Sequence, residues 1–396
     1  MKNQKKYKPH TILSQSGRSE EYAKGAVNIP PYRSSTVLFK TLKEYKAWDN
    51  QYETYRYGRL GSPNSLALED AYTELSGAYR SIATNSGMSA INIAISAFVE
   101  HGSHALVTEG AYEPTSELFH GHLSKFGVEV DFFPPEIGEE IGDLIKPTTT
   151  IVYLEAPSSN TFEICDVKSV VQAIRKKSEE MGTEIIIMFD NTWAGPLFFR
   201  SFEYDIDVEI QAATKYVVGH SDAMLGIVAC NEKTYLTIKN SARNQGICAE
   251  PDACYLGLRG LRTMAVRMNA QFKSALKIAS WLESNPKVSE VLFPPLEGSE
   301  YFQNWKKYFS GGGSLMSVIL DKKYQDPELE KFFDHMNLFS MGYSWGGFES
   351  LATPVRIQKD RKSSLDKFEN TIIRIHVGLE DPDDLISDLA LAFERL

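Results

Sequence analysis

The chain has 396 residues, of which 42% are hydrophobic and 24% are charged, and its formal net charge is −10. This composition excludes a disordered chain, and the length exceeds the roughly 250 to 300 residues at which a single core stops growing, so we expect two or three domains. The negative charge argues against nucleic acid and anionic membranes as partners, although a local basic pocket for one phosphate is compatible with it.

The start of the chain and its cysteines predict a cytoplasmic protein that does not cross a membrane. Residues 1–10 are basic, but no continuous apolar segment of a signal peptide follows them. No apolar run approaches the ~18 residues needed to span a bilayer. The four cysteines form no CxxC pair and are too few to staple a chain of this size, so reduced thiols are expected.

The first part of the chain predicts an arm followed by a large sheet domain. Residues 1–61 are less periodic and rich in Tyr, Lys and Pro, so we interpret them as an arm that wraps the body or a neighbouring subunit. From residue 62 to 258, short apolar runs alternate with amphipathic stretches, which is typical of a mostly parallel sheet with helical crossovers. Seven strands are predicted, at residues 81–84, 105–108, 128–133, 151–155, 184–189, 208–212 and 226–230. Helices are predicted at 87–100, 113–125 and 167–181, with Ser86 and Asp166 as caps.

The remaining residues, 259–396, predict a smaller α/β domain. A long helix over 259–283 keeps one apolar stripe at helical spacing, and it would link the two domains. Strands follow at 314–320 and 372–377, with a last helix near 383–395. Gly311 to Ser314 precede a strand and are interpreted as a turn.

The strongest chemical signal is the pair Asp190 and Lys215, each of which follows an apolar strand of the large sheet. Open α/β sheets bind ligands at the carboxyl ends of their strands. A carboxylate buried there is costly unless a cation meets it, and a protonated pyridine nitrogen would supply that cation. A lysine there can form a Schiff base and then act as the general base. An ion pair between Asp190 and Lys215 without catalysis explains the pattern about equally well.

Other candidate residues carry weaker signals. Ser86, Gly87 and Met88 lie between a strand and a helix, where backbone N–H groups favour a phosphate, but many strand-to-helix turns look similar. No GxGxxG or Walker sequence provides a cradle for a dinucleotide or a nucleoside triphosphate. His220 has no other histidine at ligand spacing, so we interpret it as structural and predict no metal.

Two further residues fit a small amino-acid substrate and a flat ring. Arg374 lies among apolar neighbours on a predicted strand, where its guanidinium can bind a carboxylate through two hydrogen bonds. An ion pair inside the small domain is an equally common role for such an arginine. Tyr112 follows a strand and can stack on a ring, although a single aromatic is more often part of a packed core.

Together these residues resemble the transsulfuration-enzyme family of pyridoxal-phosphate proteins, almost from end to end. The resemblance rests on eight motifs in family order, namely YRYGRLGSPN (55–64), SGMSA (86–90), AYEPT (111–115), MFDNTWA (188–194), QAATKYVVGHSDAM (211–224), GLRGLRT (257–263), FSMGYSWGGFESL (339–351) and IIRIHVGLED (372–381).

The resemblance implies an α/β fold of pyridoxal-phosphate fold type I, like that of aspartate aminotransferase, and a homotetramer built from dimers with shared active sites. It implies that Lys215 and Tyr112 are catalytic, with the Schiff base on Lys215 and the ring of Tyr112 stacked on the cofactor beside the substrate. The other implied cofactor ligands are Asp190 at the pyridinium, Gly87, Met88 and Thr214 at the phosphate, and Tyr57 and Arg59 from the neighbouring subunit. The implied substrate ligands are Arg374 at the α-carboxylate, with Ser344 assisting, and Trp345.

Three departures from the family patterns matter. Members of the family often have Ser where this chain has Ala212, which removes one hydroxyl from the phosphate site. The stretches 155–160, EAPSSN, and 343–347, YSWGG, differ from the ESPTNP and SLGG that are usual in γ-acting members. Both differences favour the branch that cleaves cystathionine by β-elimination.

The resemblance therefore implies cleavage of L-cystathionine to homocysteine, pyruvate and ammonia, the step before methionine synthesis. The alternatives are a γ-lyase of cystathionine or methionine and a broad cysteine-S-conjugate β-lyase or cysteine desulfhydrase. A cofactor-binding regulator without catalysis is a further alternative, and it would need an effector domain or a partner surface.

Overall fold

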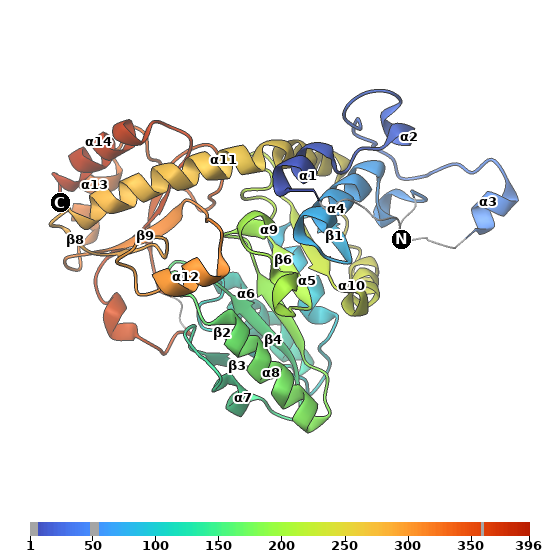
Figure 1. Cartoon of the computed structure of the whole chain (residues 1–396), viewed down its shortest axis with the longest axis horizontal. Coiled ribbons are helices and arrows are strands. Elements are labelled where there is room, and N and C mark those ends of the chain that lie inside the picture. The colour runs from blue at the N-terminus through green and yellow to red at the C-terminus, as the bar shows by residue number, and fades with distance from the viewer. Residues whose placement is uncertain (1–6, 48–54, 358–359) are drawn as a thin grey trace.

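The computed structural model describes residues 7–47, 55–357 and 360–396, and a seven-stranded sheet forms the centre of its large domain (Figure 1). The strand order is β1-β7-β6-β5-β4-β2-β3, and only β7 runs against the others. The strands are β1 (Arg80–Thr84), β2 (His104–Thr108), β3 (Glu129–Phe133), β4 (Thr149–Glu155), β5 (Ile186–Asp190), β6 (Val208–Gln211) and β7 (Gly226–Cys230). Each overlaps one of the seven predicted strands, which confirms the large, mostly parallel sheet.

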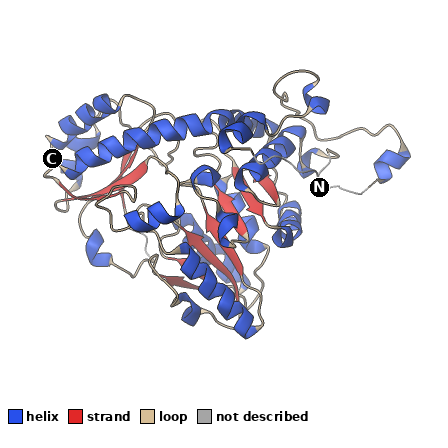
Figure 2. Cartoon of the chain, viewed as in Figure 1, coloured by secondary structure: helices blue, strands red, loops and turns tan. Residues whose placement is uncertain are grey.

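Helices surround the large sheet and form most of the outer layer (Figure 2). In the arm and the large domain they are α1 (Pro9–Gln15), α2 (Glu20–Ala23), α3 (Leu42–Lys46), α4 (Pro63–Ser76), α5 (Gly87–Ser96), α6 (Glu113–Glu117), α7 (Ile141–Leu144), α8 (Val167–Met181), α9 (Gly195–Phe198) and α10 (Glu232–Asn244). The side chains of Ser86 and Asp166 cap α5 and α8 as predicted. The helix predicted at 113–125 is broken, because α6 passes into a π turn that contains Gly121, a residue with low helix propensity.

The small domain is an antiparallel sheet covered by helices. Its strands have the order β10-β11-β9-β8. They are β8 (Val288–Leu292), β9 (Leu315–Leu320), β10 (Leu351–Val355) and β11 (Ile372–His376), and the helices are α11 (Pro251–Glu283), α12 (Phe302–Tyr308), α13 (Asp326–Phe333) and α14 (Pro382–Phe393). None of the helices in the described ranges combines the length with the apolar character that crossing a bilayer requires.

The long helix α11 begins at Pro251, earlier than the predicted start at residue 259, and it runs across the top of both domains in Figure 1. Two glycines near its start have no apolar side chain that would mark a buried helix face, yet both allow close packing. A Cβ at Gly260 would lie 2.2 Å from the carbonyl oxygen of Val217, and one at Gly257 would lie 2.6 Å from the side chain of Leu225. The helix therefore packs on the segment that follows Lys215. The domain boundary that we predict after residue 258 falls inside it.

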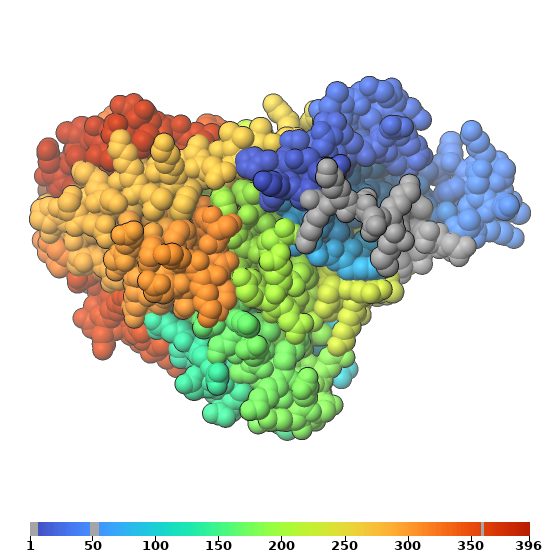
Figure 3. All heavy atoms as spheres, viewed as in Figure 1, coloured from blue at the N-terminus to red at the C-terminus, as the bar shows by residue number. Residues whose placement is uncertain are grey.

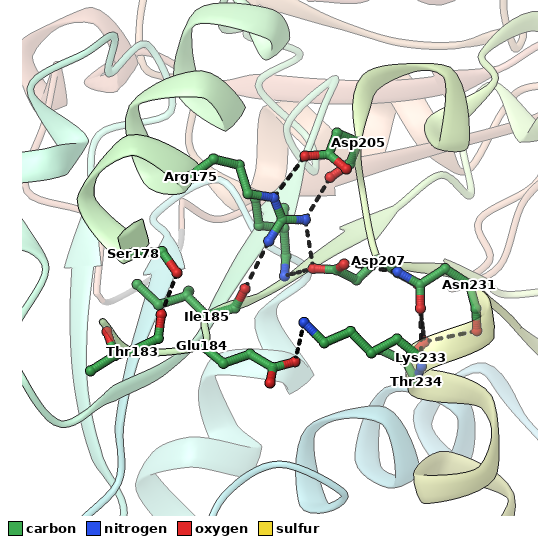
Figure 4. A network of polar contacts seen from close by, with 11 residues as sticks. Arg175, Ser178, Thr183, Glu184, Ile185, Asp205, Asp207, Asn231, Lys233 and Thr234 are labelled. Carbon is green, nitrogen blue, oxygen red and sulfur yellow. Dashed lines mark hydrogen bonds and ion pairs between the residues drawn. The ribbon is translucent and has the colours of Figure 1, made fainter. Parts of the chain in front are cut away.

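A charged network joins α8, the segment before β6 and the start of α10 at the amino ends of β5 and β6 (Figure 4). The Arg175 guanidinium, on α8, contacts the carboxylates of Asp205 at 2.9 Å and Asp207 at 2.8 Å, and it donates to the carbonyl of Ile185. Asn231, the cap of α10, donates to the other oxygen of Asp207. This network fixes the edge of the sheet opposite to the carboxyl ends of the strands.

Candidate active site

Asp190 lies at the carboxyl end of β5, buried between hydrogen-bond donors. The hydroxyl of Tyr153 donates to one carboxylate oxygen at 3.2 Å, and the backbone N–H of Thr192 donates to the other at 2.9 Å. Burial raises the pKa of Asp190, and these hydrogen bonds oppose that rise. Among the described residues, no cationic side chain lies within 4.0 Å of the Asp190 carboxylate, the limit for an ion pair. The site thus offers a buried carboxylate to a cation that none of the described side chains supplies.

Lys215 lies in the turn after β6, and its ammonium points to the small domain. Its Nζ donates a hydrogen bond of 2.8 Å to Oγ of Ser344 and lies 5.1 Å from the ring centroid of Trp345. Burial lowers the pKa of Lys215 to about 8, the charge of Arg374 acts in the same direction, and Asp190 opposes both. No direct ion pair joins Asp190 to Lys215 in the described structure. The lowered pKa of Lys215 suits its amine to nucleophilic or base chemistry.

Arg374, on β11, lies on the small-domain side of the site. Its Nη2 donates to the carbonyls of Tyr343 at 3.2 Å and Gly342 at 3.4 Å. Burial lowers the pKa of Arg374, and the neighbouring Tyr112 raises it. Within the described ranges Arg374 forms no ion pair with a carboxylate, so the ion pair considered from the sequence is not formed. The guanidinium remains suited to an incoming carboxylate.

Tyr112 lies between β2 and α6, and its side chain is not part of the packed core, because it is 46% exposed. Its backbone N–H donates a hydrogen bond of 2.8 Å to the carboxyl of Glu155, at the end of β4. Burial raises the pKa of the Tyr112 phenol, Glu155 adds to the rise, and Arg374 opposes it. The ring therefore borders the same space as Arg374, from the opposite domain.

The turn before α5 meets the turn that carries Lys215. A Cβ at Gly87 would lie 2.8 Å from Cβ of Ala212, so only glycine allows this approach. The first N–H groups of α5, which include those of Gly87 and Met88, have no acceptor within the helix, and such groups attract a phosphate. The hydroxyl of Thr214 donates to the carbonyl of Leu225 at 3.0 Å and accepts from its N–H at 2.8 Å. Thr214 must release the first bond to donate to a ligand.

Two residues of the site were missed in the sequence. Glu155 pairs with Asp190 across β4 and β5, and burial together with the charge of Asp190 raises its pKa well above the ordinary value. His376, whose pKa burial lowers to about 3, accepts a hydrogen bond of 3.1 Å from the N–H of Gly346 and so anchors the loop of Ser344. Both had a signal: Glu155 ends an apolar strand as Asp190 does, and His376 is two residues from Arg374, on the same face of a strand.

Tyr57 and Arg59 do not join the site of their own chain. Arg59 donates to the carbonyl of Arg243 at the end of α10, and Tyr57 pairs with Thr36 of the arm. Among the described residues, no hydrogen bond or ion pair links either of them to Lys215. The arm extends away from the body, with α3 at its tip (Figures 1 and 3). Residues 1–6 and 48–54 of the predicted arm lie outside the described residues.

These features define an enzyme of pyridoxal-phosphate fold type I. The carboxylate of Asp190 and the amine of Lys215 fit a pyridine ring that carries an aldehyde, and the start of α5 fits its phosphate. The chain belongs to the family described as Cys/Met metabolism PLP-dependent enzymes, whose model matches residues 10–394.

Named relatives and a solved structure agree with this membership. The chain is 41% identical to cystathionine beta-lyase MetC of Escherichia coli K12, covering 98% of each chain. It is 35% identical to the L-alanine/L-glutamate racemase of Wolbachia pipientis wMel, again over 98% of each. The crystal structure of metB from Corynebacterium glutamicum, 28% identical, superposes with a TM-score of 0.88 over 98% of both chains.

Proposed function

We propose that this enzyme is a carbon–sulfur lyase that cleaves L-cystathionine by β-elimination. The observation that carries the proposal is the arrangement of Lys215, whose amine is bonded to Ser344, lies near the ring of Trp345 and is affected by the charge of Arg374. A carboxylate-binding arginine next to a single base with a lowered pKa suits removal of a proton from the α-carbon of an amino acid. The likeness to cystathionine beta-lyase at 41% identity supports the choice of substrate.

Each residue has a part in this reaction. Arg374 binds the substrate α-carboxylate with two parallel hydrogen bonds, and Ser344 orients the amine of Lys215. Asp190 would hold the protonated pyridine nitrogen of pyridoxal phosphate, a group that would supply the electron sink that makes the α-carbon proton acidic. Lys215 takes that proton and returns one to the leaving sulfur. One water molecule is consumed, so that the products are homocysteine, pyruvate and ammonia.

Trp345 favours the β-elimination over a γ-elimination. Its ring packs edge-on against Tyr216, with centroids 5.5 Å apart, which holds it beside the amine of Lys215. A γ-elimination needs additional proton transfers at the β-carbon and hence more room for the base. Replacing Trp345 by Ala should therefore raise the share of 2-oxobutyrate among the products, and an unchanged ratio would remove this role.

Identification of the products tests the proposed function. The purified enzyme, loaded with pyridoxal phosphate, is given cystathionine, cysteine, methionine and L-alanine in separate reactions, and the keto acids are identified by mass spectrometry. Pyruvate from cystathionine at the highest kcat/KM is the expected result. Mainly 2-oxobutyrate would indicate a γ-lyase, and a preference for cysteine would indicate a desulfhydrase. D-alanine without keto acid would indicate a racemase, and no turnover at all would favour a regulator.

We also propose that the enzyme is a cytoplasmic homotetramer in which Tyr57 and Arg59 complete the phosphate site of a neighbouring subunit. Exposed apolar side chains on the extended arm, such as Leu38 at 90% exposure and Leu42 at 66%, support burial against another copy of the chain. The four cysteines are free, which suits a reducing compartment.

A further inference from the structure

A short segment of the small domain, residues 361–363 between β10 and β11, is bound to the large domain through a buried ion pair. The guanidinium of Arg361 contacts the carboxylate of Glu163 at 2.5 Å, and their side chains are 0% and 3% exposed. Its second nitrogen donates to the hydroxyl of Thr161 at 3.0 Å, and the ring of Phe368 packs against it at 4.6 Å. Arg361 thus holds the loop that follows β4.

The same segment holds the loop that follows β2. The backbone N–H of Ser363 donates to the carboxylate of Glu109 at 2.9 Å, and its hydroxyl donates to the same oxygen at 2.6 Å. These two loops are also joined to each other, since the N–H of Ser159 donates to the carbonyl of Gly110 at 2.7 Å. Segment 361–363 therefore binds the loop that carries Tyr112 and the neighbouring loop that follows β4.

The buried pair is poorly suited to stabilising the fold alone. Among the residues that the structure describes, the second carboxylate oxygen of Glu163 is buried without a hydrogen-bond partner. Removing two charges from water is costly, and apolar side chains of the same volume would often stabilise a fold at least as well. An ion pair with a forked donor gives in return a fixed distance and direction between the parts that it joins.

We propose that Arg361 is a positioning residue that sets the distance between Tyr112 on the large domain and Arg374 on the small domain. Arg374 lies on β11, the strand that segment 361–363 leads into, and Tyr112 lies on the β2 loop that this segment binds. The substrate carboxylate at Arg374 and the ring beside Tyr112 must keep one relative geometry for proton removal at the α-carbon. This inference rests on the proposed function, because it assigns the substrate carboxylate to Arg374.

Three variants of the loaded enzyme test this role, namely Arg361→Met, Arg361→Lys and Ser363→Ala. The control is Arg175→Met, which breaks a charged network at the opposite edge of the sheet (Figure 4). The measurements are KM and kcat for cystathionine, the Kd of glycine by calorimetry, amide hydrogen exchange of residues 109–112 and 157–164, and the Tm.

Arg361→Met is expected to raise KM and the Kd of glycine about tenfold and to speed exchange in both loops. Arg361→Lys should recover part of the affinity, because it keeps the charge but loses the fork to Thr161. Arg175→Met should lower the Tm and leave the Kd of glycine unchanged. If Arg361→Met does not fold, Ser363→Ala carries the test, with a smaller rise in Kd and faster exchange at 109–112.

A fall in Tm with wild-type Kd and exchange in the segment variants would overturn the role of Arg361, as would an equal rise in Kd in Arg175→Met. Glycine binding requires no turnover, so it separates this inference from the proposed function. A wild-type enzyme that binds glycine but releases no pyruvate would refute the lyase activity alone.

Discussion

Lys215 and Ser344 belong to different domains, yet a hydrogen bond of 2.8 Å joins Nζ of the lysine to Oγ of the serine. The loop of Ser344 packs tightly on the lysine, since a Cβ at Gly346 would lie 2.9 Å from the carbonyl carbon of Lys215. The orientation of the amine therefore depends on the small domain as well as on the sheet that carries the lysine.

The pH dependence of cofactor capture should report the lowered pKa of Lys215. Only the neutral amine attacks an aldehyde, so the rate at which the cofactor-free enzyme binds pyridoxal phosphate covalently should rise with pH, with a midpoint at about 8 instead of the ordinary 10.5. Arg374→Ala removes a neighbouring positive charge, so the midpoint should move to higher pH. Stopped-flow absorbance measures these rates. A midpoint above 10 in the wild-type enzyme would contradict the expectation.

Replacing Asp190 by Asn should weaken cofactor binding and catalysis together. The carboxylate loses its charge-assisted bond to the pyridine nitrogen, a loss of about 10- to 100-fold in affinity and at least as much in kcat. Equilibrium dialysis and keto-acid formation measure the two effects. Glu209→Gln is the matched control, because Glu209 is also fully buried, on the neighbouring strand β6. That variant should lower the Tm and leave cofactor affinity near that of the wild type.

Replacing Ala212 by Ser should strengthen cofactor binding. The added hydroxyl lies beside Gly87 at the start of α5 and donates one more hydrogen bond to the phosphate, which is worth about 2- to 10-fold in Kd. The rate of cofactor loss during dialysis measures this effect. Gly87→Ala should act in the opposite direction, because its Cβ would collide with Ala212. Equal rates for Ala212→Ser and the wild type would place the phosphate elsewhere.

Mixing two inactive variants should restore activity if subunits share their active sites. Lys215→Ala and Arg59→Ala lack different parts of one composite site, so a mixed dimer contains one intact site and one site with both changes. Random reassociation after mild denaturation should give about a quarter of the wild-type activity. Each variant refolded alone is the control. Activity that never exceeds the mean of the two controls would show that each chain completes its own site.

The sequence was sufficient for most of the sheet, and the structure places the predicted Asp190 and Lys215 at its carboxyl edge, where their roles stay predictions. Apolar runs of strand length located all seven strands, and the position of Asp190 and Lys215 just after two of them indicated the carboxyl edge. The predicted start of α11 at residue 259 was wrong, because the helix already begins at Pro251. Gly257 and Gly260 near that start have low helix propensity and allow close packing instead. Their role depends on Leu225 and Val217, which the sequence does not connect to them.

The parts that could not be predicted are contacts between distant segments. Arg361 and Glu163 are far apart in the chain, and either residue alone has the pattern of an ordinary surface charge. Their burial results from the meeting of two domains. The neutral state of His376 has the same origin, since it depends on how tightly the loop of Gly346 closes over β11.

The charged network around Arg175 and Asp207 stabilises the edge of the large sheet that lies opposite the candidate active site. One edge is cross-linked by side chains that have no proposed part in the reaction, whereas the other holds buried charged groups such as Asp190 and Glu155. An engineer can therefore alter substrate choice at the reactive edge while reinforcing the opposite one, with little interference between the two sets of changes.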